Sequence, residues 1–178
     1  MADLGIRRAR ESELAAVGAL TVDGYDSEGY LLRDDGTRDE GYAAWLADAA
    51  RRSREAVLLV AVERDVLLGT VTWCPPGSAN REVATLPHQG ELRTLAVAPA
   101  ARGRGVGGAL VDRCLAEARS AGLTEVVLSS LPAMLPAHRL YTTRGFVRRP
   151  ELDWRPHPDV PLWVFTRPVG PPSDAPFE

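Results

Sequence analysis

The sequence predicts an α/β protein built on a mixed sheet with helices on both faces. Two observations support this prediction. Some segments repeat apolar residues at the three- and four-residue spacing of a helix, whereas others are short apolar runs typical of buried strands. Strands and helices do not alternate regularly along the chain, so a parallel doubly wound sheet is not expected. We expect a single domain over residues 1–178, because this length suits one hydrophobic core.

The first half of the chain is predicted to form a strand, two helices and a hairpin. Residues 4–8 form a short strand, and Ser12 with its acidic neighbours starts a helix. A polar loop precedes a second helix over residues 39–52, where apolar residues recur at helical spacing. Two apolar runs, 56–62 and 66–73, flank a short polar tip and predict a β-hairpin.

The second half contains the helix with the clearest sequence signal. An irregular connection with three prolines leads to a strand over residues 91–97. The helix over 105–121 has a continuous apolar stripe, and Gly122 follows it where a left-handed cap is expected. The remaining predicted elements are a strand at 124–129, a helix at 136–144, strands at 146–154 and 161–167, and a tail at 170–178.

Composition excludes several classes of function. The formal net charge of -3 gives no global attraction to nucleic acid or to an anionic membrane. All 21 basic residues are arginine, a bias typical of a GC-rich bacterial genome. Cys74 and Cys114 provide no disulfide framework. The start of the chain lacks the pattern of a secretion signal, and no apolar stretch is long enough for a membrane span, so we expect a cytoplasmic protein.

A glycine-rich segment over residues 102–108 lies between a predicted strand and the predicted helix at 105–121. Glycines allow a ligand to approach the backbone closely, and the first turn of a helix has amide hydrogens without internal partners. Together with the helix dipole, these donors favour a phosphate. Arg102 and Arg104 add charged donors. The segment therefore predicts an anion site, and a pyrophosphate fits it best.

The spacing of Gly103, Gly105 and Gly108 also satisfies the G-x-G-x-x-G pattern of dinucleotide-binding proteins. The context argues against this interpretation. Residues 98–102 separate the strand from the glycines, and the next strand ends in serines rather than in an acidic ribose ligand. A nicotinamide-dependent oxidoreductase is therefore disfavoured, and no G-K-[ST] follows that would indicate a Walker loop.

The segment resembles the acetyl-CoA site of the GNAT superfamily of N-acyltransferases. The family pattern [R/Q]-x-x-G-x-[G/A] falls on Arg102, Gly105 and Gly107, after the strand ELRTLAV and before the later segment LYTTRGF. This resemblance implies the acyl-CoA N-acyltransferase fold, with a central, mostly antiparallel sheet of six to seven strands flanked by helices. It also implies an N-acetyltransferase that uses acetyl-CoA as acyl donor, with no metal.

The resemblance assigns the coenzyme-binding residues. In the family, a bulge separates two neighbouring strands, and the pantetheine arm pairs with exposed backbone groups, which here belong to Leu95, Ala96 and Val97. The amide of Leu95 would stabilise the oxyanion of the thioester carbonyl. The pyrophosphate would bind the loop and the helix start, that is Arg102, Gly103, Arg104, Gly105, Val106, Gly107 and Gly108.

Two residues match catalytic positions of the family. Tyr141, in the LY-x-x-x-GF segment, would protonate the departing thiolate, although it could instead be a core tyrosine. Glu91 stands at the usual position of the general base, which an alkyl amine of pKa near 10 requires. Alternatively, Glu91 forms an ion pair with Arg93 on the same face of the strand. Met134 replaces an asparagine that often contacts the coenzyme arm.

The acceptor is expected to be a primary amine on a small molecule or a peptide, and its identity stays open. The loop over 23–39 contains aromatic and acidic residues, among them Asp26 and Glu28, that would favour a cationic amine. Many members of the family form homodimers, so this assembly is one option. The alternative function is a domain that binds acyl-CoA as a sensor without efficient catalysis.

Overall fold

A computed structural model describes residues 4–170, and its core is one mixed β-sheet. Within this range the sheet has eight strands in the order β1-β2-β3-β4-β5-β8-β6, and β7 pairs with β8. β4 and β5 run parallel, and the other pairs are antiparallel. The strands are β1 (Gly5–Arg8), β2 (Val57–Glu63), β3 (Val66–Cys74), β4 (Gln89–Val97), β5 (Glu125–Ser130), β6 (Val147–Arg148), β7 (Trp154–His157) and β8 (Val160–Pro168).

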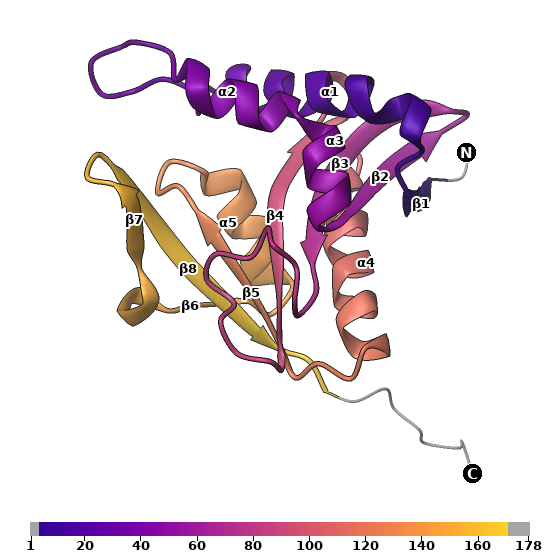
Figure 1. The fold of residues 1–178 in the computed structure, drawn as a ribbon, viewed down its shortest axis with the longest axis vertical. Helices are drawn as coiled ribbons and strands as arrows, with labels where there is room; N and C mark the ends of the chain where they lie inside the picture. Colours follow the sequence, from indigo (N-terminus) through magenta and orange to yellow (C-terminus); the bar gives the residue numbers. More distant parts are fainter. Residues whose placement is uncertain (1–3, 171–178) are drawn as a thin grey trace.

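Helices cover both faces of this sheet (Figure 1). On β2, Leu58 and Val60 pack toward α1 and α3, whereas Leu59 and Ala61 pack into the main core beneath α4. This alternation follows from the two-residue period of a strand, and it shows that the two helical layers lie on opposite faces. The helices are α1 (Leu14–Asp26), α2 (Glu40–Ala47), α3 (Ala49–Glu55), α4 (Val106–Ser120) and α5 (Leu135–Thr143).

The predicted fold class is confirmed, with three differences in its elements. The sheet has one strand more than the expected six to seven, because β7 pairs with β8. The predicted helix over 39–52 is two helices, since Asp48 ends α2 and its carboxylate caps α3 through the amide of Arg51 at 2.9 Å. Instead of one strand over 146–154, the structure has the two-residue strand β6, followed by a 3-10 turn that begins at Pro150.

Two further expectations concern the ends of the chain and the membrane. Of the predicted tail, residues 171–178 lie outside the described part of the chain. Between residues 4 and 170, none of the helices combines the length and the apolar character that a membrane span requires.

Candidate functional site

β4 contains a β-bulge shortly before the glycine-rich loop. Val71 on β3 lies opposite two residues of β4, Thr94 and Leu95. Thr94 has a φ of 49°, a left-handed value that a β-branched residue rarely adopts. Its hydroxyl oxygen lies 2.6 Å from that of Thr72 on β3, and this hydrogen bond holds the bulge. Such backbone strain costs about 1–3 kcal/mol and persists where the surrounding structure over-determines it.

β4 and β5 stop pairing just before this bulge. Their last paired residues are Leu92 and Leu128, although both strands continue. Beyond the bulge, the amide of Ala98 donates to a carbonyl of β3 at 2.9 Å. Because successive amides of a strand point in opposite directions, those of Leu95 and Val97 point away from β3, toward the side where pairing with β5 has ended. The amides of Leu95 and Val97 are thus directed toward the part of the sheet where β4 and β5 no longer pair.

The loop that follows β4 leads into the start of α4. Gly103 and Gly105 have φ values of 73° and 79°, which favour glycine over any residue with a side chain. Gly105 is also the N-cap of α4, and no side-chain hydrogen bond caps this end of the helix. A Cβ at Gly103 or Gly105 would meet nothing within 4 Å, so the space beside the loop is open. These features suit the binding of an anion.

Both arginines of the loop are paired with carboxylates. Arg102 contacts the carboxylate of Glu28 and donates to the hydroxyl of Ser27 at 2.7 Å, at the end of α1. Arg104 donates to both carboxylate oxygens of Glu63 at 2.8 and 2.9 Å. A bound phosphate would therefore compete with these two carboxylates for the guanidinium groups. Arg102 also connects the glycine loop to the segment between α1 and α2.

Ion pairs with arginine also involve two of the acidic residues in the loop over 23–39, which was expected to attract a cationic amine. Arg38 donates to both carboxylate oxygens of Asp26, at 3.0 and 2.7 Å, and this hydrogen bonding lowers the pKa of Asp26. Glu28 is paired with Arg102. Because both carboxylates already have a cationic partner, this geometry gives little support to an acidic wall that attracts an amine.

Tyr141 on α5 is buried between the helix and the sheet. Its side chain packs against Phe146 and Phe165, with ring centroids 5.8 and 6.1 Å away. Burial, together with the nearby Cys114 and Tyr30, raises the pKa of its phenol well above the usual range. The phenol therefore keeps its proton at neutral pH and is able to donate it. Both sequence interpretations, a core tyrosine and a proton donor, are compatible with this environment.

Glu91 on β4 is almost completely buried and already has several partners. Its Oε2 accepts hydrogen bonds from the backbone amides of Glu82, Val83 and Ala84 at 2.8, 2.9 and 3.0 Å. Its Oε1 lies 3.7 Å from Nε of Arg93. The ion pair anticipated from the sequence is therefore long, and the main partners of Glu91 come from the connection between β3 and β4.

The chain was compared with known protein families and structures. The acetyltransferase (GNAT) family model matches residues 21–146. The chain belongs to the acetyltransferase (GNAT) family. No match was found among curated protein sequences.

Several solved structures of acetyltransferases share the fold of this GNAT chain. The structure of yncA from Salmonella typhimurium with acetyl-CoA has 21% identity and a TM-score of 0.65, covering 98% of each chain. A ribosomal-protein-alanine N-acetyltransferase from Brucella melitensis has 22% identity and a TM-score of 0.66, covering 93% of this chain and 100% of its own. A GNAT acetyltransferase from Staphylococcus aureus Mu50 reaches a TM-score of 0.70 at 13% identity, covering 94% and 100%.

This GNAT chain also contains a charged and aromatic cluster that the sequence did not indicate. Nη2 of Arg93 on β4 lies 2.8 Å from the carboxylate of Glu82, and Nη1 of Arg93 donates to the backbone carbonyl of Asn80 at 2.6 Å. The guanidinium of Arg93 lies over the ring of Trp45 on α2, 5.1 Å from its centroid. Tyr42 stacks on Trp45 at 5.8 Å. Glu82 gave no signal in the sequence, because it lies in a connection without periodicity.

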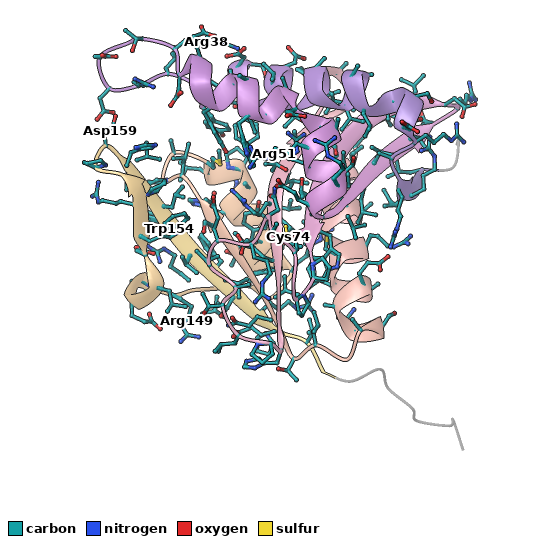
Figure 2. The ribbon with its side chains drawn as sticks, in the orientation of Figure 1. Arg38, Arg51, Cys74, Arg149, Trp154 and Asp159 are labelled. Carbon is teal, nitrogen blue, oxygen red and sulfur yellow. The ribbon has the colours of Figure 1, made fainter. Side chains whose placement is uncertain are left out.

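Two segments distant in sequence approach each other, the tip of the β7–β8 hairpin and the segment between α1 and α2 (Figure 2). Figure 2 shows Asp159 at the tip of the β7–β8 hairpin, opposite the segment between α1 and α2 that carries Arg38. The hydrogen bond and the charge of Asp39 raise the pKa of Arg33 in that segment, and the charge of Asp159 acts in the same direction. The tip of the hairpin and the α1–α2 segment therefore face each other (Figure 2).

Proposed function

We propose that this GNAT enzyme transfers an acetyl group from acetyl-CoA to a primary amine, by direct attack of the amine in a ternary complex. One observation carries the proposal. The bulge at Thr94 and Leu95 coincides with the end of the pairing between β4 and β5, immediately before a glycine loop that opens onto a helix start. An acyl-CoA has a pyrophosphate for the helix start and an amide-containing arm that can pair with a strand edge.

The residues of the coenzyme site fit these two parts of the ligand. In the proposed complex, Leu95, Ala96 and Val97 offer backbone groups to the arm, and the amides from Gly103 to Gly108 bind the pyrophosphate. The open space beside Gly103 and Gly105 leaves room for phosphate oxygens. Arg102 and Arg104 supply positive charge once the phosphate replaces their carboxylate partners.

The chemistry requires stabilisation of an oxyanion and protonation of a thiolate. The amine attacks the thioester carbonyl, and the amide of Leu95 donates to the oxygen that becomes negative. The carbon–sulfur bond then breaks, and Tyr141 gives its proton to the departing sulfur. Direct transfer is favoured because Cys74 and Cys114 are both fully buried, and burial raises their thiol pKa, for Cys74 to about 12. Neither thiol is available at neutral pH to form an acyl-enzyme.

The first test is binding followed by turnover. Thermal melting should show stabilisation by acetyl-CoA and coenzyme A and none by NAD or ATP, with a gain of about 2.7 kcal/mol at a hundredfold excess over Kd. Thiol release is then measured with a panel that contains spermidine, free amino acids and a lysine-containing peptide. Stabilisation by NAD alone would contradict the proposed use of the glycine loop.

The variant Tyr141→Phe separates an enzyme from a sensor. It should bind acetyl-CoA like the wild type but lower kcat by about 100-fold, because it lacks the proton donor. A chain that binds acetyl-CoA and releases no thiol with any amine, before or after this substitution, would be a sensor.

A further inference from the structure

The proposed reaction needs a group that removes a proton from the ammonium form of the amine, and the following inference rests on that proposed function. Glu91 is poorly suited to this task. Three backbone amides donate to its Oε2 at 2.8–3.0 Å, and its side chain is 1% exposed. With Oε2 occupied by three backbone donors and the side chain out of contact with solvent, an incoming ammonium group has no open path to this carboxylate.

The three amides bound by Glu91 identify its role. They belong to consecutive residues, 82–84, in the connection between β3 and β4. Glu91 therefore fixes the backbone at Glu82 and determines where that side chain lies. Arg93 fixes the same connection from the same strand, through Asn80 and through the carboxylate of Glu82.

The carboxylate of Glu82 differs from that of Glu91 in its accessibility. Its side chain is 40% exposed, whereas that of Glu91 is 1% exposed. It lies against Arg93, two residues before Leu95 on β4, which corresponds to roughly 7 Å along a strand. The bulge at Thr94 and Leu95 interrupts the two-residue alternation, so Arg93 shares its face of β4 with Ala96, and the Leu95 side chain packs on the opposite face in the main core. The face of Ala96 and Arg93 is the one covered by α1 and α2, where Arg93 lies over Trp45, and Glu82 lies against Arg93 on that face.

The groups around Glu82 make it more basic than an ordinary glutamate. Burial of part of the side chain raises its pKa, Arg93 lowers it, and the charge of Glu91 raises it, with a net upward shift. Tyr42 on α2 and Cys74 on β3 are the other titratable neighbours, and each senses the charge of Glu82. A carboxylate with a raised pKa is a better proton acceptor near neutral pH.

We propose that Glu82, held in place by Glu91 and Arg93, is the proton acceptor of the acetyl transfer. Its carboxylate takes one proton from the ammonium group of the acceptor, directly or through one water, and becomes a neutral acid. The free amine then forms the new carbon–nitrogen bond, the thioester carbon–sulfur bond breaks, and the thiolate receives its proton from Tyr141. The second proton, which the nitrogen loses as the amide forms, passes to solvent, and the Tyr141 phenolate takes one proton back from solvent. Glu82 returns its proton to solvent when the product leaves. Glu91 is a positioning residue in this scheme.

The main test compares Glu82→Gln with the wild type, using the most reactive amine of the panel. This substitution keeps the backbone amide that Glu91 binds, so the fold and the stabilisation by acetyl-CoA should be retained. We expect kcat/KM to fall by about 100-fold for a strongly basic amine. With hydroxylamine, which is mostly unprotonated at neutral pH, the loss should be much smaller. The acid limb of the wild-type pH profile, above the ordinary glutamate value of about 4.3, should disappear in the variant.

A second variant distinguishes the loss of a proton acceptor from a change in local structure. Added formate should restore part of the activity of Glu82→Ala, because a small carboxylate can occupy the vacated space. A purely structural role of Glu82 would show no such rescue. The matched control is Glu40→Gln on α2, which removes a carboxylate paired with Arg38 and should leave the pH profile unchanged.

Glu91→Gln distinguishes the two carboxylates. We expect a lower melting temperature and an acid limb that is still present. The opposite pattern, in which Glu91→Gln loses the acid limb while remaining folded and Glu82→Gln keeps it, would overturn the inference and leave the proposed function intact. A wild type that is stabilised by acetyl-CoA and acetylates no amine would overturn the proposed function and this inference with it.

Discussion

The two sides of the proposed active site are built in different ways. On the coenzyme side, defined as the end of β4, the glycine loop and the start of α4, the contacts on offer are backbone amides. On the acceptor side, defined as α1, α2, the segment between them and the connection over 75–88, the contacts are side chains such as Trp45, Arg93 and Glu82. A site built from backbone amides requires glycines at fixed positions in the sequence. A site built from side chains can be formed by many combinations of residue types. The sequence therefore indicates the proposed coenzyme side by its glycine pattern, whereas the proposed acceptor side has no comparable pattern.

The largest expected effect concerns the packing that holds the acceptor side together. A Cβ at Gly18 in α1 would lie 2.0 Å from the backbone oxygen of Ala47 at the end of α2. Because a backbone atom cannot move aside cheaply, Gly18→Ala should destabilise the fold by about 3 kcal/mol. Thermal melting measures this loss. The control Gly41→Ala in α2 meets only an ordinary contact at 3.6 Å and should be neutral or slightly stabilising. Equal melting of the two variants would contradict the described contact between α1 and α2.

The second effect should be confined to the coenzyme side. Gly105→Ala forces a residue with a side chain into a φ of 79° and places a methyl group in the space assigned to the pyrophosphate. The backbone cost of roughly 1–2 kcal/mol should appear as a similar loss of stability, and the Kd for coenzyme A should rise by about tenfold or more. Gly77→Ala, at a φ of 85° in the connection over 75–88, imposes the same strain and should leave that Kd unchanged. Calorimetric titration would separate the two variants.

A smaller effect should come from the link between the two sides. Glu28→Gln removes the carboxylate that competes with phosphate for Arg102. Since exposed ion pairs are worth about 0.2–1 kcal/mol, coenzyme A should bind up to about fivefold more tightly. Glu63→Gln is the matched control on Arg104 and should act in the same direction. Weaker binding in the Glu28 variant would show that Arg102 must remain attached to α1 for the site to form.

The last prediction is that the rate of acetyl transfer stays constant at moderately alkaline pH. Burial raises the pKa of Tyr141, so its phenol remains a proton donor beyond the ordinary tyrosine value of about 10. The rate of acetyl transfer should therefore not fall between roughly pH 8 and 10 through ionisation of this residue. A pH–rate profile of the wild type checks this. A fall in that interval that is missing in Tyr141→Phe would mean that the phenol ionises earlier than its burial implies.

The backbone features of the proposed coenzyme side are those that a sequence pattern can indicate, because they require glycine at particular positions. The glycine pattern and the strand before it appear where the structure has positive φ values and the end of strand pairing. The break at Asp48 was not predicted, because apolar spacing continues across it while a single carboxylate caps a new helix. Glu82, for which we propose a catalytic role, was not indicated by the sequence for a related reason. Its position depends on three amides that bind Glu91, and such contacts leave no periodic pattern in the sequence.

The limited pairing of β4 with β5 also has a mechanical consequence. Four residue pairs, from Gln89 with Glu125 to Leu92 with Leu128, form the seam between a panel of β1 to β4 and a panel of β5, β8 and β6 (Figure 1). The two pairings that flank the seam are longer, with five pairs between β3 and β4 and six between β5 and β8. We therefore expect the sheet to bend more easily along this seam than along either of its two flanking pairings. A ligand that pairs with both strands beyond Leu92 would lengthen the seam. Binding should then make the sheet harder to bend, and hydrogen exchange of the amides near the bulge should slow.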